Sequence, residues 1–90
     1  MSEKLRSDAR VCYDDARALL EKGQTVGAIA LLTKAIALDG DYADAYQLRG
    51  QLRYDIGDKA GAESDLRRLL ELAPDSLAHV SGEWTSTTSR

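Results

Sequence analysis

Residues 43–74 read ADAYQLRGQLRYDIGDKAGAESDLRRLLELAP, and this stretch decides the fold. Its apolar residues recur at steps of three and four, which is typical of two amphipathic helices, and Gly57-Asp58 is the turn signal between them. The pattern returns when the chain is shifted back by 34 residues. The shift aligns Gly57 with Gly23, Ala62 with Ala28, Leu66 with Leu32, Leu72 with Leu38, Gly50 with Ala16, Tyr46 with Cys12 and Pro74 with Gly40. The chain therefore contains two copies of one helical hairpin, at about residues 9–42 and 43–76.

The residues around each turn predict the helix ends. Gly23 and Gly57 are expected to end the first helix of each hairpin, because glycine takes the left-handed conformation of a C-terminal cap without a Cβ penalty. Thr25, Asp41 and Asp58 are the expected N-caps, since short polar side chains accept hydrogen bonds from free backbone N–H groups. The expected helices run from about Ser2 or Ser7 to Lys22, from Val26 to Leu38, from Tyr42 to Ile56 and from Lys59 to Leu72.

A 34-residue repeat made of two helices and a short turn resembles the tetratricopeptide repeat family. The second copy has the aromatic residue of that family at Tyr46, its small residue at Gly50 and its terminal proline at Pro74. The first copy has Cys12 in place of the aromatic residue and Gly40 in place of the proline. Departures from the family pattern are Asp15 and Arg49, where the family usually has apolar residues, and Leu69, where it usually has alanine. The resemblance implies an all-α fold, an α-solenoid of two antiparallel helical hairpins with four helices.

The end of the chain carries fewer structural signals. Pro74 is expected to end the second hairpin, because proline cannot continue a helix. Residues 77–80 are the candidate for a short C-terminal capping turn. Residues 81–90 are rich in serine and threonine and are expected to be mobile. The predicted organisation is a two-repeat domain at residues 1–80 followed by this tail.

The composition argues against several classes of partner. A net charge of −3, with 43% apolar and 30% charged residues, is typical of a soluble helical protein. No apolar run approaches the roughly 20 residues that cross a bilayer, so no membrane association is expected. Lysine and arginine do not gather into a basic stripe, so nucleic acid is not an expected partner. The polar start MSEKLRSD lacks the apolar core of a secretory signal, and the expected location is cytoplasmic.

No combination of residues predicts catalysis, a metal site or a cofactor. A single cysteine and a single histidine do not make a zinc site, and Cys12 is interpreted as a small core residue. His79 lacks the rigidly placed nucleophile and orienting acid that a catalytic triad needs. Glu63, Asp65 and Glu71 are interpreted as a solvated helix face. The chain is therefore not expected to be an enzyme.

The resemblance also implies a binding surface. In the proteins that this chain resembles, the first helix of each hairpin lines a concave groove that holds a peptide or helix of another protein. The corresponding positions here are Arg10, Tyr13, Arg17, Gln47, Gln51 and Tyr54, with Leu20, Glu21, Asp44 and Asp55 at further groove positions. Aromatic and arginine side chains are favoured interface anchors, although an ordinary solvated surface is the alternative interpretation. The sequence thus predicts a scaffold or adaptor that mediates protein–protein interaction.

The number of repeats suggests a rival function, structural self-association. Solenoid repeats bury their faces against their neighbours, and about three are usually needed for stability. The fourth helix has no following hairpin, so its leucines need cover from residues 77–84 or from another chain. The candidates for self-association are Leu66, Leu69 and Leu70, and a C2 homodimer is the expected form.

Overall fold

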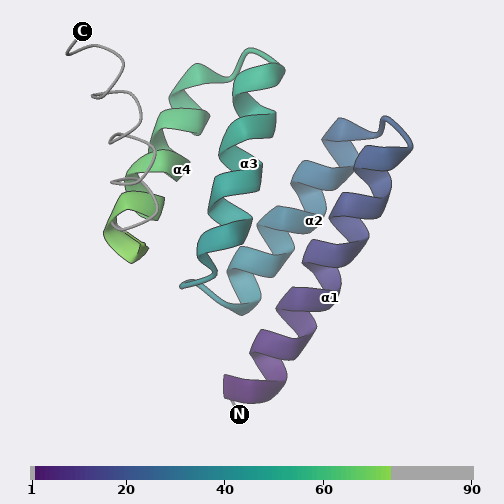
Figure 1. Cartoon of the computed structure of the whole chain (residues 1–90), viewed down its shortest axis with the longest axis vertical. Coiled ribbons are helices and arrows are strands. Elements are labelled where there is room, and N and C mark those ends of the chain that lie inside the picture. The colour runs from purple at the N-terminus through teal and green to yellow at the C-terminus, as the bar shows by residue number, and fades with distance from the viewer. Residues whose placement is uncertain (1, 74–90) are drawn as a thin grey trace, which may run out of the picture.

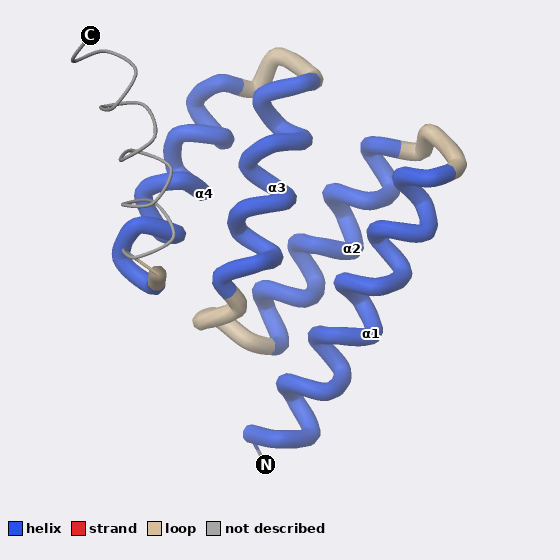
Figure 2. Tube along the Cα trace, viewed as in Figure 1, coloured by secondary structure: helices blue, strands red, loops and turns tan. Residues whose placement is uncertain are grey.

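The structure is a computed structural model that describes residues 2–73; Pro74, the capping turn expected at residues 77–80, His79 and the tail at residues 81–90 lie outside these residues. Its four helices are α1 (Ser2–Glu21), α2 (Thr25–Leu38), α3 (Ala43–Asp55) and α4 (Lys59–Leu72). Successive helices run in opposite directions (Figure 1), and residues 2–73 contain no strand (Figure 2). α1 packs on α2, α2 on α3 and α3 on α4. The predicted all-α fold of antiparallel helical hairpins is confirmed.

The two hairpin turns share one backbone geometry. Gly23 and Gly57 have φ angles of 78° and 93°, in the left-handed region. At each turn the glycine N–H donates to the carbonyl three residues back, and the next N–H donates to the carbonyl five residues back. The donor and acceptor pairs are Gly23 and Leu20 at 2.9 Å, Gln24 and Leu19 at 2.9 Å, Gly57 and Tyr54 at 3.1 Å, and Asp58 and Arg53 at 2.8 Å. This is the Schellman motif, and the predicted glycine caps are confirmed.

Of the three expected N-caps, Asp58 is the one whose side chain caps its helix. Its carboxylate accepts a hydrogen bond from the Gly61 N–H at 3.0 Å, so this prediction is confirmed. The expectation for Thr25 is wrong, because α2 begins at Thr25 and the preceding residue, Gln24, is the N-cap. The Gln24 carbonyl accepts from the Ala28 N–H at 3.0 Å, so the Schellman turn leads directly into the helix.

The expectation for Asp41 is also wrong, because α3 begins later than predicted. Tyr42 occupies its N-cap position and makes no side-chain cap bond. Asp41 lies in the preceding turn, where its N–H donates to the Asp39 carboxylate at 3.1 Å. The Tyr42 N–H donates to the Asp39 carbonyl, also at 3.1 Å. Asp39 therefore organises this turn and places Tyr42 at the start of α3.

The core between α1, α2 and α3 consists mainly of small side chains. The residues with no exposed surface are Ala9, Ala16, Ala28, Leu32, Ala35 and Ala45. Alanine lets helix backbones approach closely, since helix separation depends on the side chains at the contact. Cys12 is 8% exposed and belongs to the same cluster, which confirms its interpretation as a core residue.

Enlarging one of these alanines is expected to destabilise the hairpin. Ala28→Leu adds three carbons at a position with no exposed surface, so we expect the free energy of unfolding to fall by about 1–3 kcal/mol. Val26→Leu is the matched control, because Val26 lies on the same helix and is 74% exposed. Thermal unfolding followed by circular dichroism measures both variants. An unchanged melting temperature for Ala28→Leu would contradict the close α1–α2–α3 packing.

The second hairpin closes around a glycine and a buried carboxylate. A Cβ placed on Gly50 would lie 3.2 Å from the Asp65 Cβ and 3.5 Å from the Ala62 carbonyl oxygen. The absence of a side chain at Gly50 therefore lets α3 approach α4 closely near Ala62. The interpretation of Asp65 as a solvated residue is wrong, because Asp65 is 1% exposed. Glu63 and Glu71 are exposed as expected, whereas Asp65 lies on the side of α4 that faces α3.

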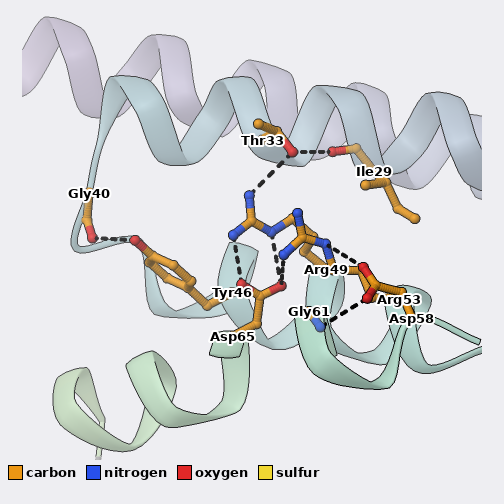
Figure 3. A network of polar contacts seen from close by, with 9 residues as sticks. All are labelled: Ile29, Thr33, Gly40, Tyr46, Arg49, Arg53, Asp58, Gly61 and Asp65. Carbon is orange, nitrogen blue, oxygen red and sulfur yellow. Dashed lines mark hydrogen bonds and ion pairs between the residues drawn. The ribbon is translucent and has the colours of Figure 1, made fainter. Parts of the chain in front are cut away.

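Two arginines of α3 balance the buried carboxylate (Figure 3). Arg49 donates from Nε to Asp65 Oδ2 at 2.9 Å and from Nη2 to Oδ1 at 2.6 Å, which is a bidentate pair. Arg53 Nη1 donates to Oδ2 at 3.2 Å. Arg49 also donates to Thr33 Oγ1 at 3.2 Å, and its guanidinium lies 5.7 Å from the centre of the Tyr46 ring. The network thus joins α2, α3 and α4.

Candidate interaction surface

Three of the predicted groove residues form a row on α1. Arg10, Tyr13 and Arg17 each follow a buried residue by one position; the buried residues are Ala9, Cys12 and Ala16. One position along an α-helix is a rotation of about 100°, so this row borders the contact of α1 with its neighbours. Arg10 and Arg17 are exposed, and Tyr13 is half-buried.

The other three residues lie on α3. Gln47 and Gln51 correspond to Tyr13 and Arg17 in the 34-residue repeat, and Tyr54 follows two turns after Gln47. All three are exposed, with Tyr54 at 63%. α1 and α3 run in the same direction (Figure 1), so equivalent positions of the two hairpins turn towards a common side of the solenoid.

An aromatic contact joins the α1 row to the start of α3. The ring centroids of Tyr13 and Tyr42 are 5.3 Å apart, with 35° between the ring planes. Burial raises the pKa of the Tyr13 hydroxyl, the Asp44 carboxylate raises it further, and Arg17 opposes this shift. At neutral pH the Tyr13 hydroxyl is therefore protonated, and it can donate or accept a hydrogen bond. The Tyr13 side chain of α1 thus meets the N-cap residue of α3.

Arg10 lies near the same aromatic pair. Burial raises the pKa of the Tyr42 hydroxyl, and the neighbouring Arg10 guanidinium partly offsets this rise. Both side chains line a depression of about 470 Å³ between the first half of α1 and the connection from α2 to α3. The remaining lining residues are Glu3, Arg6, Ser7 and Asp39. Two guanidinium groups and two carboxylates make this depression polar, so it suits charged or hydrogen-bonding groups of a ligand.

Tyr42 is a residue of this surface that the sequence interpretation missed. The repeat gives no signal for it, because the equivalent residue of the first hairpin is Asp8. The available signal is its type, since Tyr42 is an aromatic residue that directly follows the polar turn Asp39-Gly40-Asp41. Such a side chain needs a surface to pack on, and here that surface is Tyr13.

Arg49 and Asp65 were also missed as partners, although the sequence held a signal for them. Asp65 is equivalent to Leu31 of the first hairpin, and Arg49 stands where an apolar residue was expected. When two opposite charges in one hairpin occupy positions where apolar residues are expected, they are expected to pair with each other. Arg49 Nη2 lies 2.6 Å from Asp65 Oδ1, which agrees with this expectation.

The three leucines of α4 that were candidates for self-association have different environments. Leu69 is 3% exposed and belongs to the interior of its own chain, which corrects its place in this set. Leu66 and Leu70 are 44% and 50% exposed. The apolar surface that α4 offers to another molecule is therefore centred on these two leucines.

The groups on these surfaces suit non-covalent binding. They comprise hydroxyl, amide, guanidinium and carboxylate groups and two exposed leucines, carried on helices and on the connection from α2 to α3. In residues 2–73, no group of three histidine, cysteine, aspartate or glutamate side chains is placed to hold a metal ion. None of the four described helices combines the length and the apolar character that spanning a bilayer requires.

Comparison with known families bears on the repeat from the last turn of α1 onwards. A family model described as tetratricopeptide repeat matches residues 19–82, from the last turn of α1 to beyond the end of α4. The matched range covers more than half of the chain and includes both glycine turns. No curated protein matches the chain.

Proposed function

The chain belongs to the tetratricopeptide repeat family, and on this premise we propose that it is an adaptor that holds a segment of another protein against α1 and α3. Repeats of this family typically act as protein-interaction modules without catalytic activity. The bound segment is a peptide or a helix, and its contacts are with Arg10, Tyr13, Arg17, Gln47, Gln51 and Tyr54. Tyr42 is added to this set because it packs on Tyr13.

The observation that carries the proposal is the half-exposed pair of Tyr13 and Tyr42 between two exposed arginines. Tyrosine and arginine are enriched among the residues that dominate binding energy. The ring of Tyr13 is held by Tyr42, so little side-chain freedom remains to be lost when a partner binds. Both tyrosines also belong to the margin of the hydrophobic core, which makes this part of the surface rigid.

The charges along the two rows favour one orientation of the partner. Arg10 and Arg17 make the α1 row basic, whereas Asp44 and Asp55 make the α3 side acidic. A partner segment with carboxylates towards α1 and basic side chains towards α3 therefore complements this surface. Such complementarity sets the orientation of the partner and its rate of association more than its affinity.

Removing the exposed tyrosine is the test of this groove. A display library of peptides of about 12 residues is selected against the intact chain; this length is enough to follow a helix as long as α3. Titration calorimetry then measures the dissociation constant of the selected peptide. Tyr54→Ala is expected to raise its dissociation constant at least tenfold, because an aromatic anchor is lost. Unfolding should be little affected, since Tyr54 is 63% exposed.

Tyr13 and an unrelated site complete the design. Tyr13→Ala is expected to weaken peptide binding more than Tyr54→Ala does. It is also expected to lower the stability of the chain, because Tyr13 packs on Tyr42. Val26→Ala is the control, since Val26 is 74% exposed on α2 and outside both rows. If the peptide bound the Tyr13→Ala and Tyr54→Ala variants as tightly as it binds the unaltered chain, the proposed binding groove would be disproved.

Self-association through α4 is a second candidate function. One observation favours it: Leu66 and Leu70 are about half exposed on the last described helix. The groove and this face use different residues, so the two functions are compatible. The unit would then be an assembly of adaptors rather than a single one.

A further inference from the structure

The two hairpins are copies in sequence but differ in how their second helix is covered. Leu32 on α2 has no exposed surface, whereas the equivalent Leu66 on α4 is 44% exposed. Ile36 packs against the core, whereas the equivalent Leu70 is 50% exposed. α2 is covered by α1 on one side and α3 on the other, whereas among the helices of residues 2–73 α4 packs mainly against α3. The face of α4 around Leu66 and Leu70 is therefore the place where another helix fits.

A helix in repeat register from the same chain would be a poor cover for this face. On α3 the residues that pack against the first hairpin include Ala45, Leu48 and Leu52. The residues 34 positions later are His79, Gly82 and Ser86. These offer little apolar surface to two leucines, so we look to another molecule for the occupant.

We infer that the occupant is a second copy of the chain, with the two α4 helices packed antiparallel about a two-fold axis. This inference rests on the proposed self-association through α4. Leu66 and Leu70 are four residues apart and share one side of the helix. In an antiparallel pair, Leu66 of each copy packs against Leu70 of the other, and the patch is self-complementary as a C2 interface requires.

The charges beside the leucines favour the antiparallel direction. Arg67 and Glu71 are exposed and four residues apart on the flank of the same face. When Leu66 packs against Leu70 of the second copy, residue 67 lies nearly opposite residue 69 of that copy, within reach of its Glu71. Two Arg67–Glu71 pairs form, one on each side of the axis. In a two-fold parallel pair the Arg67 side chains of the two copies would lie on opposite flanks of the contact, so no Arg67–Glu71 pair would form between copies. Glu71 also accepts from Arg68 of its own chain at 2.9 Å, which leaves its second oxygen for the new pair.

Sedimentation equilibrium of the full chain at concentrations from about 10 µM to 1 mM tests the inference. The range extends to high concentration because two leucines per copy make a small, weak interface. The average mass is expected to rise towards that of a dimer. Leu66→Lys and Leu70→Lys are each expected to keep the chain monomeric, since both place a charge in the apolar contact. Val26→Lys, on exposed α2 surface, is the control and should leave the association unchanged.

Charge variants then separate the direction of packing from association itself. Arg67→Glu is expected to raise the dissociation constant of the dimer roughly tenfold, because it breaks two rim pairs and makes two repulsive ones. Arg67→Glu combined with Glu71→Arg should restore it. If Arg67→Glu leaves the dissociation constant of the dimer unchanged, Arg67 makes no ion pair between copies, and the antiparallel inference fails while self-association stands. A chain that stays monomeric at 1 mM overturns both, and it leaves the peptide groove of α1 and α3 untouched.

Discussion

Asp65→Ala is expected to lower the free energy of unfolding by about 3 kcal/mol or more, a large part of the stability of a chain of this size. Asp65 is 1% exposed, and its carboxylate balances the charge of Arg49 and part of that of Arg53. Removal leaves the Arg49 side chain, which is 12% exposed, without a counter-charge. Arg53 is less affected, because it is more exposed and has Asp58 at 3.8 Å.

Chemical denaturation at low protein concentration, followed by circular dichroism, measures this loss. Glu63→Ala is the matched control: it removes a carboxylate from the same helix two residues earlier, at an exposed position. We expect it to change stability by less than about 0.5 kcal/mol. If Asp65→Ala were as stable as Glu63→Ala, the carboxylate would not be buried against Arg49.

Replacing both partners should be far less harmful than replacing one. Arg49→Leu with Asp65→Leu is expected to restore stability to within about 1 kcal/mol of the unaltered chain, or to exceed it. The pair pays its desolvation cost in the folded state, and an apolar pair does not. Leucine also occurs at the equivalent of Asp65 in the first hairpin, Leu31. If the double variant were as unstable as Asp65→Ala, the bond from Arg49 to Thr33 would be the important one instead.

Leu32→Ala is expected to cost about 3 kcal/mol, because it leaves a cavity at a position with no exposed surface. Leu66→Ala removes the same atoms at the equivalent position of the second hairpin. There the side chain is 44% exposed, so the expected cost is below about 1 kcal/mol. The contrast is large because neighbouring helices enclose Leu32 on α2 and leave Leu66 on α4 partly open.

Denaturation of both variants at a few concentrations checks this contrast. At low concentration Leu32→Ala should lower the free energy of unfolding by about 2 kcal/mol more than Leu66→Ala does. At high concentration the cost of Leu66→Ala should grow, because the variant loses the proposed contact between two copies. Equal costs at low concentration would contradict the exposure of Leu66 and would mean that the same chain covers it.

Much of the surface that we propose for binding could be read from the sequence. The family resemblance assigned Arg10, Arg17 and Gln51 to a surface groove, and all three are exposed, because helix periodicity assigns each position to a side. The role of Tyr42 could not be read in this way. Its position depends on a turn organised by Asp39, and its partner Tyr13 lies far from it in sequence.

The sequence by itself determined the local features of this protein: four helices, their order and the two glycine turns. These follow from apolar spacing and from the left-handed conformations of Gly23 and Gly57, which involve only residues close in the chain. The tertiary structure alone decided that Asp65 is buried while Glu63 is solvated, and that Leu32 is enclosed while Leu66 is partly exposed. The physical reason is that equivalent positions carry the same local pattern, whereas burial and charge balance depend on which helix packs against each face.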